Sequence, residues 1–177
     1  MSESVVGITT PVGREILSGL RHGDRVLLSG DILVFRDQVH LILCEMIGRG
    51  ESLPFDLTGA VLYYCGPTPG RDGMPVGSAG PTTASRMDKF TEPLLERGLA
   101  ATIGKGNRSP EVTALLEKYG AVYFAAVGGA GAYLGKKVKK AEIVAFSELG
   151  PEAARVFTVD DMPLIVGIDS MGGSAFV

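Results

Sequence analysis

The pattern of apolar and polar residues divides the chain into short strands and helices separated by turns rich in glycine and proline. Segments rich in β-branched residues, with apolar side chains at alternating positions or in short runs, predict strands. The predicted strands cover residues 4–10, 24–36, 59–65, 99–104, 121–129 and 141–147, and residues 155–170 hold two more. The segment 24–36 is expected to bend at Ser29, Gly30 and Asp31, with a strand on each side of the bend.

Helices are predicted between these strands. The clearest helix follows Ser109, which is the expected N-cap, with Pro110 at the first helical position and Gly120 at the end. Another helix is expected to start near Asp37 and to end at the glycines around residue 50. Shorter helices are predicted over residues 12–23, 83–90, 92–97 and 130–138, whereas residues 66–80 form a loop without a regular pattern.

The order of these elements predicts the fold class. The middle of the chain alternates strand, loop and helix, which is typical of a parallel sheet with crossover helices. Both ends add strands without helices between them. We therefore expect an α/β fold in three layers, with a mixed, partly parallel sheet and an extra small sheet, in a single domain over residues 1–177.

Composition and charge narrow the class of protein. The chain has 177 residues, of which 45% are hydrophobic and 25 are glycines, as in a globular α/β protein with many tight turns. The net charge of −3 favours neither nucleic acid nor an anionic membrane surface as a partner. The amino terminus lacks a signal-peptide pattern, and no apolar stretch approaches the roughly 20 residues of a membrane span. We therefore expect a cytoplasmic protein.

The cysteines indicate thiols rather than metal ligands. The chain has two, Cys44 and Cys65, in apolar segments without a CxxC spacing or neighbouring histidines. Free cysteine packs as a small hydrophobic residue, so two reduced, buried thiols are expected and no metal site in this chain.

Three loops that follow predicted strands each carry a cation. Ligands of open α/β sheets gather beyond the carboxyl ends of the strands. One loop brings Arg36, a second brings Thr82, Thr83 and Arg86, and a third brings Lys105 together with Asn107 and Arg108. Because the net charge of the chain is negative, three cations at one edge predict a local site for an anion.

The stretch GPTTASRM, Gly80 to Met87, has an unusual helix start. The two threonines are typical of an N-cap, but Arg86 follows in the first turn, where acidic residues are normally preferred. The arrangement favours an incoming anion as the missing partner. His40 falls four residues after Arg36 on the predicted helix, where it would support the Arg36 loop from behind.

Two glycine-rich segments suggest other ligands. The segment GKGNRS lacks the spacing of a phosphate-binding loop, and a carboxylate-binding lysine is the simpler interpretation of Lys105. The segment from Gly129 to Gly135 follows a strand, as a dinucleotide-binding turn does, but Leu134 stands where that fingerprint has glycine or alanine. Two classes of protein other than an enzyme therefore stay open: a nucleotide-binding domain, and a non-catalytic partner of another protein.

Four segments together resemble one family. GPTTASRMD, the preceding GPTPG, SGDILVFRDQVH and GKGNRS are similar, in order and spacing, to the β subunit or C-terminal domain of the iron–sulfur hydro-lyases. That family comprises the class I fumarate hydratases and the L-tartrate dehydratases. The resemblance spans roughly residues 23–169 and implies a swivelling β/β/α domain.

The resemblance also implies roles for residues. In the family's motif Thr82 corresponds to the base that removes a proton from C3 of malate, and Arg36, Arg86 and Lys105 to groups that hold the substrate carboxylates. Beside the roles that the resemblance implies, we expect Thr83 and His40 to be supporting residues, and Ser85 has no implied role. The implied activity is the reversible hydration of fumarate to L-malate, a reaction of the tricarboxylic acid cycle, with tartrate as the alternative substrate.

The family's [4Fe–4S] cluster belongs to the α subunit or the N-terminal domain. A cluster with one open iron needs about three thiolate ligands, and this chain has two cysteines. We therefore expect the chain to supply half of an active site to an α subunit that carries the cluster. Pairs of α and β subunits that form a higher oligomer are implied by the resemblance.

Overall fold

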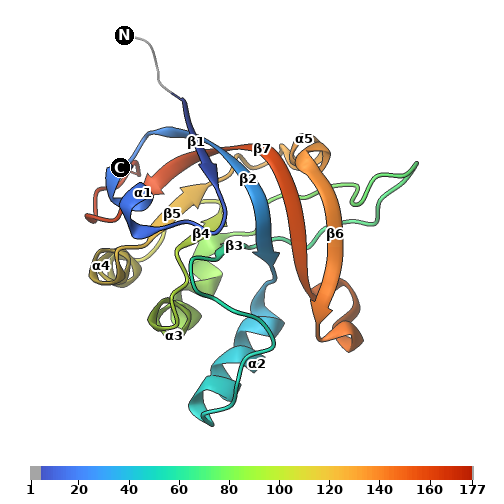
Figure 1. Ribbon diagram of the computed structural model, residues 1–177, viewed down its shortest axis with the longest axis horizontal. Coiled ribbons are helices and arrows are strands. Elements are labelled where there is room, and N and C mark those ends of the chain that lie inside the picture. Colours follow the sequence, from blue (N-terminus) through green and yellow to red (C-terminus); the bar gives the residue numbers. More distant parts are fainter. Residues whose placement is uncertain (1–4, 177) are drawn as a thin grey trace.

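A computed structural model describes residues 5–176 and shows a mixed sheet covered by helices (Figure 1). The strands of the described part are β1 (Val5–Thr9), β2 (Arg25–Val34), β3 (Val61–Tyr63), β4 (Ala101–Gly104), β5 (Val122–Ala125), β6 (Val138–Ala145) and β7 (Ala154–Ile168). The helices are α1 (Arg14–Gly19), α2 (Asp37–Gly48), α3 (Thr91–Glu96), α4 (Pro110–Tyr119) and α5 (Gly131–Lys137), with 3-10 helices η1 (Ala84–Phe90) and η2 (Ser147–Glu152).

The sheet is mixed and curls into a ring. Strands β1 to β5 are neighbours in sequence order and run parallel, whereas β7 is antiparallel to β2, β5 and β6. Because β7 pairs with β2 along one side and with β5 along the other, the strands β2, β3, β4, β5 and β7 close on themselves. The expected mixed, partly parallel sheet is confirmed, but the expected extra small sheet is wrong, because all seven strands of the described part pair within one sheet that closes on itself.

The predicted bends are bulges inside continuous strands, so β2 and β7 are each one strand where two were expected. The ladder between β2 and β7 shifts between Leu28 and Gly30, and Asp161 on β7 has a positive φ of 49° at that point. The main-chain N–H of Asp161 donates to Ser29 Oγ at 2.9 Å. A bulge bends both strands without ending either, so β7 pairs with β2 on both sides of the bend.

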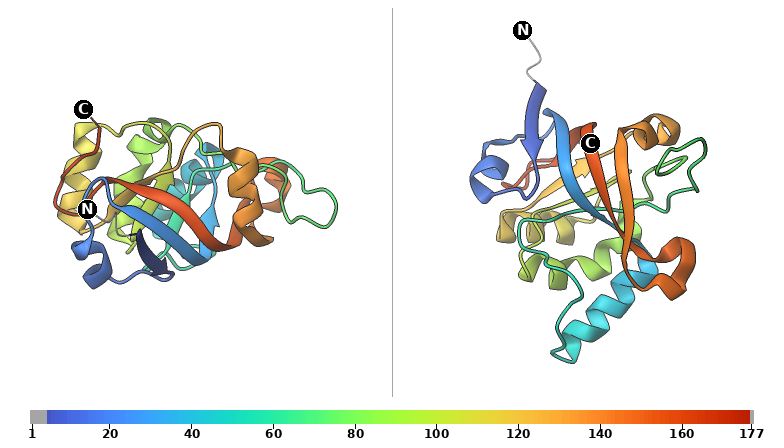
Figure 2. Two further views of the ribbon diagram at one scale, coloured as in Figure 1. Left: turned by 90° about the horizontal axis from the view of Figure 1, so that it is seen from above. Right: turned by 45° about the vertical axis from the view of Figure 1, so that its right-hand side comes forward.

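Two apolar cores separate three layers. Along β3, Val61 and Tyr63 enter the core between the two β layers, whereas Leu62 enters the core between the sheet and the helices. That second core contains Leu43 of α2 and Leu116 of α4. The views in Figure 2 agree with this order of layers, with α2, α3 and α4 on one side of the sheet. The predicted β/β/α arrangement is therefore confirmed.

The predicted helices are present, with two differences. Helix α4 has the expected ends, since Ser109 Oγ accepts the N–H of Val112 at 3.2 Å and Gly120 is left-handed with φ 64°. The predicted helix 83–90 is the short 3-10 helix η1, and the side chain of Thr83 makes no capping hydrogen bond, so the expected threonine cap is wrong. The 3-10 helix η2 was not predicted from the sequence.

Residues 66–80 form an arm that projects from the body of the molecule (Figures 1 and 2). Thr68 donates its N–H to Ser78 O and accepts the N–H of Gly77, both at 3.0 Å, and Pro69 pairs with Val76. Gly131 and Gly135 of α5 lie against the base of this arm, because a Cβ at Gly131 would come within 2.3 Å of Ser78 Oγ.

Candidate functional site

The predicted anion-binding residues lie beyond the carboxyl ends of neighbouring parallel strands. Arg36 follows β2, and Lys105 directly follows β4. The strand β3 between them leads through Tyr64 and the arm to Thr82. Since β2, β3 and β4 are parallel neighbours, all three loops open at the same edge of the sheet.

Main-chain hydrogen bonds hold Thr82 and Lys105 side by side. The N–H of Thr82 donates to Tyr64 O at 2.7 Å, the N–H of Lys105 donates to Thr82 O at 3.1 Å, and the N–H of Ala84 donates to Lys105 O at 2.9 Å. Gly104 permits this approach, because a Cβ there would lie 2.9 Å from the Cβ of Ala84. Thr82, Thr83 and Lys105 therefore continue the sheet as one short parallel bridge beyond β4.

Arg36 is held by contacts on two sides. Its Nη2 donates to Glu152 on η2, and its guanidinium lies against Gly66, where a Cβ would come within 2.5 Å of Arg36 Cζ. The Nε of Arg36 is buried and has no hydrogen-bond partner among the described residues. One donor of this guanidinium is therefore unused.

Arg86 pairs with the residue next to Arg36. Its Nη2 lies 2.5 Å from Asp37 Oδ2, and the Arg86 side chain is 53% exposed. Asp37 is the first residue of α2, so this ion pair joins η1 to the start of α2. The pair brings Arg86 to the loop of Arg36, and the carboxylate of Asp37 supplies part of the negative charge that the sequence predicts beside Arg86.

His40 supports Arg36 through the main chain. Its Nδ1 donates to Arg36 O at 2.7 Å, and its ring packs among Phe35, Tyr64 and Phe90 with centroids 4.9–5.5 Å away. Burial lowers the pKa of His40 to about 4, although the Arg36 carbonyl and Asp37 oppose the shift. The imidazole is therefore neutral at pH 7 and acts as a fixed donor to the Arg36 carbonyl.

Arg108 has a structural environment that the sequence did not indicate. The sequence predicts a loop cation at Arg108, beside Lys105, but the Arg108 side chain is buried and pairs with Asp88 on η1 at 2.6 Å. It also donates to Thr91 Oγ1 at 2.8 Å and to Thr102 Oγ1 at 3.1 Å. Asp88 is twenty residues away in the sequence, and no local pattern links the two.

Thr82 and Lys105 keep their side chains available. Within residues 5–176, no hydrogen bond of the Thr82 hydroxyl and no ion pair of Lys105 is found, and the Lys105 side chain is exposed. Lys105 Cδ reaches toward Gly128, where an added Cβ would lie 3.6 Å from it. The edge thus holds one uncompensated cation beside two arginines that already face carboxylates.

The chemistry of the cysteines does not fit an iron–sulfur cluster on this chain. Burial raises the pKa of Cys65 to about 12 and also raises the pKa of Cys44, so neither thiol lies in a setting that favours the thiolate form, which is the form that binds iron. Cys44 contacts the carbonyl of Phe90 and lies apart from other ligands. In the described part of the chain, no three His, Cys, Asp or Glu side chains form a group suited to a metal ion.

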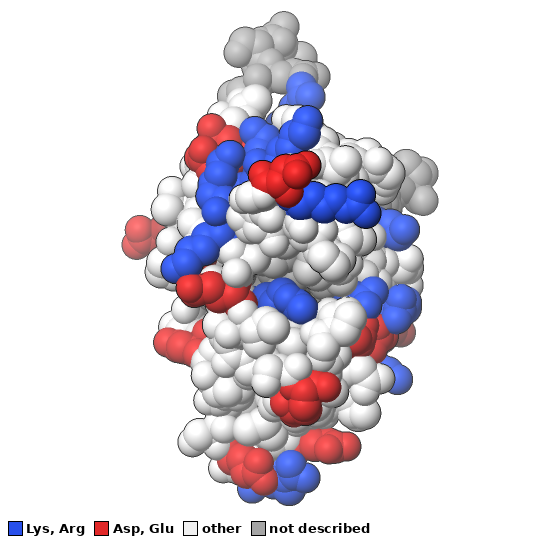
Figure 3. All heavy atoms as spheres, turned by 90° about the vertical axis from the view of Figure 1, so that its right-hand side faces the viewer, with Lys and Arg blue, Asp and Glu red and all other residues white. Residues whose placement is uncertain are grey.

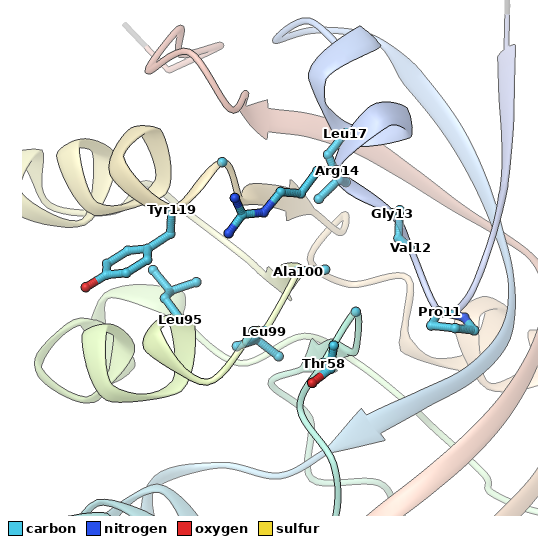
Figure 4. A pocket seen from close by; sticks show the side chains of 13 residues that line it. Pro11, Val12, Gly13, Arg14, Leu17, Thr58, Leu95, Leu99, Ala100 and Tyr119 are labelled. Atoms are coloured by element: carbon cyan, nitrogen blue, oxygen red, sulfur yellow. The ribbon is translucent and has the colours of Figure 1, made fainter.

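A cavity of about 460 Å³ lies at the opposite edge of the sheet, where β3, β4 and β5 begin. Figure 4 shows Arg14 extending from α1 toward Tyr119, above Leu95 and Leu99. The remaining walls are mainly apolar side chains and glycine backbone, and the predicted anion-binding residues are absent from its lining.

Among the described helices, none has the length and apolar character needed to cross a membrane.

The protein class follows from a match over nearly the whole chain. The family model described as the fumarase C-terminus matches residues 2–177. The chain therefore belongs to the fumarase C-terminus family, and the resemblance inferred from the sequence is confirmed.

Individual relatives show how much of each protein the chain represents. Fumarate hydratase class I, anaerobic, of Escherichia coli is 39% identical over 168 residues, covering 92% of this chain and 31% of that protein. Fumarate hydratase 2 of Leishmania major is 38% identical over 165 residues, covering 92% of this chain and 29% of that protein. The chain thus spans less than a third of the length of these two relatives. The putative L(+)-tartrate dehydratase subunit beta of Methanocaldococcus jannaschii is 40% identical over 163 residues, covering 89% of this chain and 84% of that protein.

Proposed function

We propose that the chain is the β subunit of an iron–sulfur hydro-lyase that interconverts fumarate and L-malate. The observation that carries this proposal is the placement of Thr82 beside Lys105, at the edge where the Arg36 and Arg86 loops also open. The names of the relatives, fumarate hydratase and tartrate dehydratase, support a hydro-lyase acting on a small dicarboxylate.

The cations would bind the two carboxylates of the substrate. Lys105 has no carboxylate partner among the described residues, whereas Arg36 and Arg86 each keep further N–H donors beyond their bonds to Glu152 and Asp37. A dianion would be held by Lys105 and by these remaining donors. Removal of the C3 proton puts additional negative charge on the adjacent carboxylate, so these contacts strengthen in the transition state.

Thr82 would move the proton. A threonine hydroxyl is a weak base unless its ionised form is stabilised by nearby positive charge. Two observations support this role: main-chain bonds hold the Lys105 backbone beside Thr82, and Arg86 follows Thr82 on the same segment. Because η1 is a 3-10 helix of seven residues, these side chains rather than a helix dipole would favour the alkoxide.

A partner polypeptide would supply the rest of the site. The thiols of this chain do not fit the cluster, so we propose an α subunit that carries it and that closes over the edge bearing Thr82. The αβ pair, any larger oligomer and the fumarate specificity all belong to this proposal. The alternative substrate is L-tartrate, because it presents two carboxylates to the same cations.

Co-expression of this chain with its α subunit tests the proposal. We expect the purified pair to consume fumarate or malate, measured by the ultraviolet absorbance of fumarate, and the isolated chain to be inactive. Replacing Thr82 by alanine should lower kcat by at least ~10², because a general base is lost, without loss of pairing. Ser85→Ala removes a hydroxyl from the same segment and should leave kcat unchanged. Activity on L-tartrate alone would move the assignment to tartrate dehydratase, and a Thr82→Ala pair with normal kcat would refute the role of Thr82.

A further inference from the structure

An apolar groove of about 510 Å³ lies between α5, the amino-terminal ends of β1 and β2, and the second half of β7. Four large apolar side chains around it are exposed: Val5 by 50%, Val127 by 63%, Tyr133 by 54% and Ile165 by 38%. Single exposed apolar residues are ordinary, but four around one groove form a continuous patch of the kind that marks a protein interface. We call these four residues the apolar rim.

The apolar rim reaches the candidate site. Val127 follows β5 at the carboxyl edge of the sheet, and the next residue, Gly128, lies against the side chain of Lys105. Helix α5, which carries Tyr133, packs on the base of the arm through Gly131 and Gly80. Thr82 follows the last residue of the arm by two positions. The groove, α5 and the candidate site are therefore neighbours on the surface.

The longer relatives indicate what would cover this surface. The family is described as the C-terminus of fumarase, and the chain spans 31% of the Escherichia coli relative. In such a protein the rest of the polypeptide reaches this domain at its amino-terminal end. Val5, on the amino-terminal strand β1, is a member of the apolar rim, so polypeptide that precedes this domain in such relatives would join it through the strand that borders the groove.

Charge adds a second property to the expected partner. Lys136 and Lys137 lie in the last turn of α5, next to Tyr133, and Lys139 and Lys140 follow on β6. Figure 3 shows many Lys and Arg side chains, with Asp and Glu side chains among them, in the upper half of the face on which α5 and β6 lie. A partner segment with apolar side chains flanked by acidic residues would complement both features.

We propose that the apolar rim is the surface on which the α subunit docks, which places the cluster-bearing polypeptide next to Lys105 and Thr82. This inference rests on the proposed function, because it takes the α subunit as its occupant. The groove buries an apolar segment of the α subunit, and Lys136 and Lys137 of α5 select acidic residues beside that segment, whereas Lys140 of β6 already pairs with Glu142 at 3.0 Å.

Binding of the purified chain to the α subunit without its cluster tests this surface, with isothermal titration calorimetry as the readout. Val127→Asp and Tyr133→Asp place a carboxylate in the apolar rim and should weaken binding by at least ~10-fold. Ile16→Asp on α1, where the apolar side chain is 45% exposed and lies outside the groove, is the matched control and should bind as the wild type does. Far-ultraviolet circular dichroism and thermal unfolding would show that all variants fold.

Each outcome of the titration separates the docking surface from the proposed function. If the Val127→Asp and Tyr133→Asp variants bind the α subunit and are as active with it as the wild type, the proposed docking surface is wrong. The proposed function is not affected by that result. A wild-type chain that neither binds the α subunit nor becomes active with it overturns both. If light scattering shows an isolated-chain dimer that Tyr133→Asp dissociates, the apolar rim belongs to self-association, and the α subunit is the wrong occupant.

Discussion

Arg108 and Asp88 form an ion pair in which Arg108 Nε lies 2.6 Å from Asp88 Oδ1 and the Arg108 side chain has no exposed surface. The other carboxylate oxygen of Asp88 accepts the N–H of Ser109 at 2.9 Å. Asp88 belongs to η1, and Arg108 ends the loop that carries Lys105. The pair therefore fixes the segment of Thr82 and Arg86 relative to the loop of Lys105.

Removing the carboxylate of this pair should destabilise the fold strongly. In Asp88→Asn the guanidinium stays buried without its counter-charge, a change that typically costs about 3–5 kcal/mol. The free energy of unfolding in urea would measure the loss. The exposed pair of Lys118 and Glu92, 3.1 Å apart, is the control, and Lys118→Met should change stability little. Equal stability of the Asp88→Asn and wild-type chains would show that the pair does not hold these segments.

Arg86→Ala should impair handling of the substrate carboxylate in the reconstituted enzyme. Loss of one charge-assisted hydrogen bond is worth roughly 1.5–3 kcal/mol, so kcat/KM should fall by about 10- to 100-fold. Arg86→Lys should restore little of the lost kcat/KM. The planar guanidinium of arginine can bind Asp37 and the substrate carboxylate at once, whereas the ammonium of lysine cannot. Steady-state kinetics measure both variants, and unchanged kcat/KM in Arg86→Ala would remove Arg86 from the binding site.

Gly66→Ala should displace Arg36 without a comparable loss of stability. The new Cβ would come within 2.5 Å of Arg36 Cζ, and a flexible side chain can move away more readily than backbone can. We expect a higher KM for the dicarboxylate and a nearly unchanged urea midpoint. Gly48→Ala, at a position with no heavy atom within 4 Å of the new Cβ, is the control for adding a methyl group. The role of Arg36 would be contradicted if KM stayed the same while Arg36 was seen to have moved.

His40 should make stability depend on pH below neutrality. Burial lowers the pKa of His40 from 6.5 to about 4 in the folded chain, so the unfolded chain binds a proton first as the pH falls. The stabilisation is complete above pH 6.5 and declines toward pH 4, by up to about 3 kcal/mol.

Urea unfolding at several pH values between 4 and 7 would measure this effect of His40. His40→Asn keeps a donor for the Arg36 carbonyl but does not titrate, so its stability should vary less with pH than that of the wild type. His22→Gln changes a histidine that pairs with Asp169 elsewhere in the fold, and it should retain the His40 dependence. Parallel pH profiles for wild type and His40→Asn would exclude His40 as the source.

The sequence was sufficient for features that local chemistry determines. Ser109, Pro110 and Gly120 specify both ends of α4 within a few residues, and the structure agrees with them. The continuous apolar run that includes Val61, Leu62 and Tyr63 correctly indicated a strand, and the structure places that strand between the two cores. The alternation of strands and helices predicted that the loops of Arg36, Thr82 and Lys105 open at one edge of a parallel sheet, and the parallel pairing of β2, β3 and β4 agrees with it.

Features that depend on distant segments were not predictable from these patterns. Glu152 is 116 residues from its partner Arg36, and η2, which carries it, has no clear helical pattern. The sequence predicts a break in β2 at Ser29, Gly30 and Asp31. The strand continues through these residues because it pairs with Asp161 on β7, which no local pattern links to them. The burial of Arg108 likewise depends on Asp88 and Thr91, which only the packing of η1 and α3 against β4 brings near.

The pairing of β7 with both β2 and β5 has a consequence for synthesis on the ribosome. Residues 154–168 are translated last among the strands, yet they contribute Phe157, Met162 and Val166 to the core between the β layers. While the nascent chain is still incomplete, that apolar interior faces solvent and β2 has an open edge. Ribosomal stalling before Ala154 would therefore leave this apolar interior exposed to other chains, which favours aggregation.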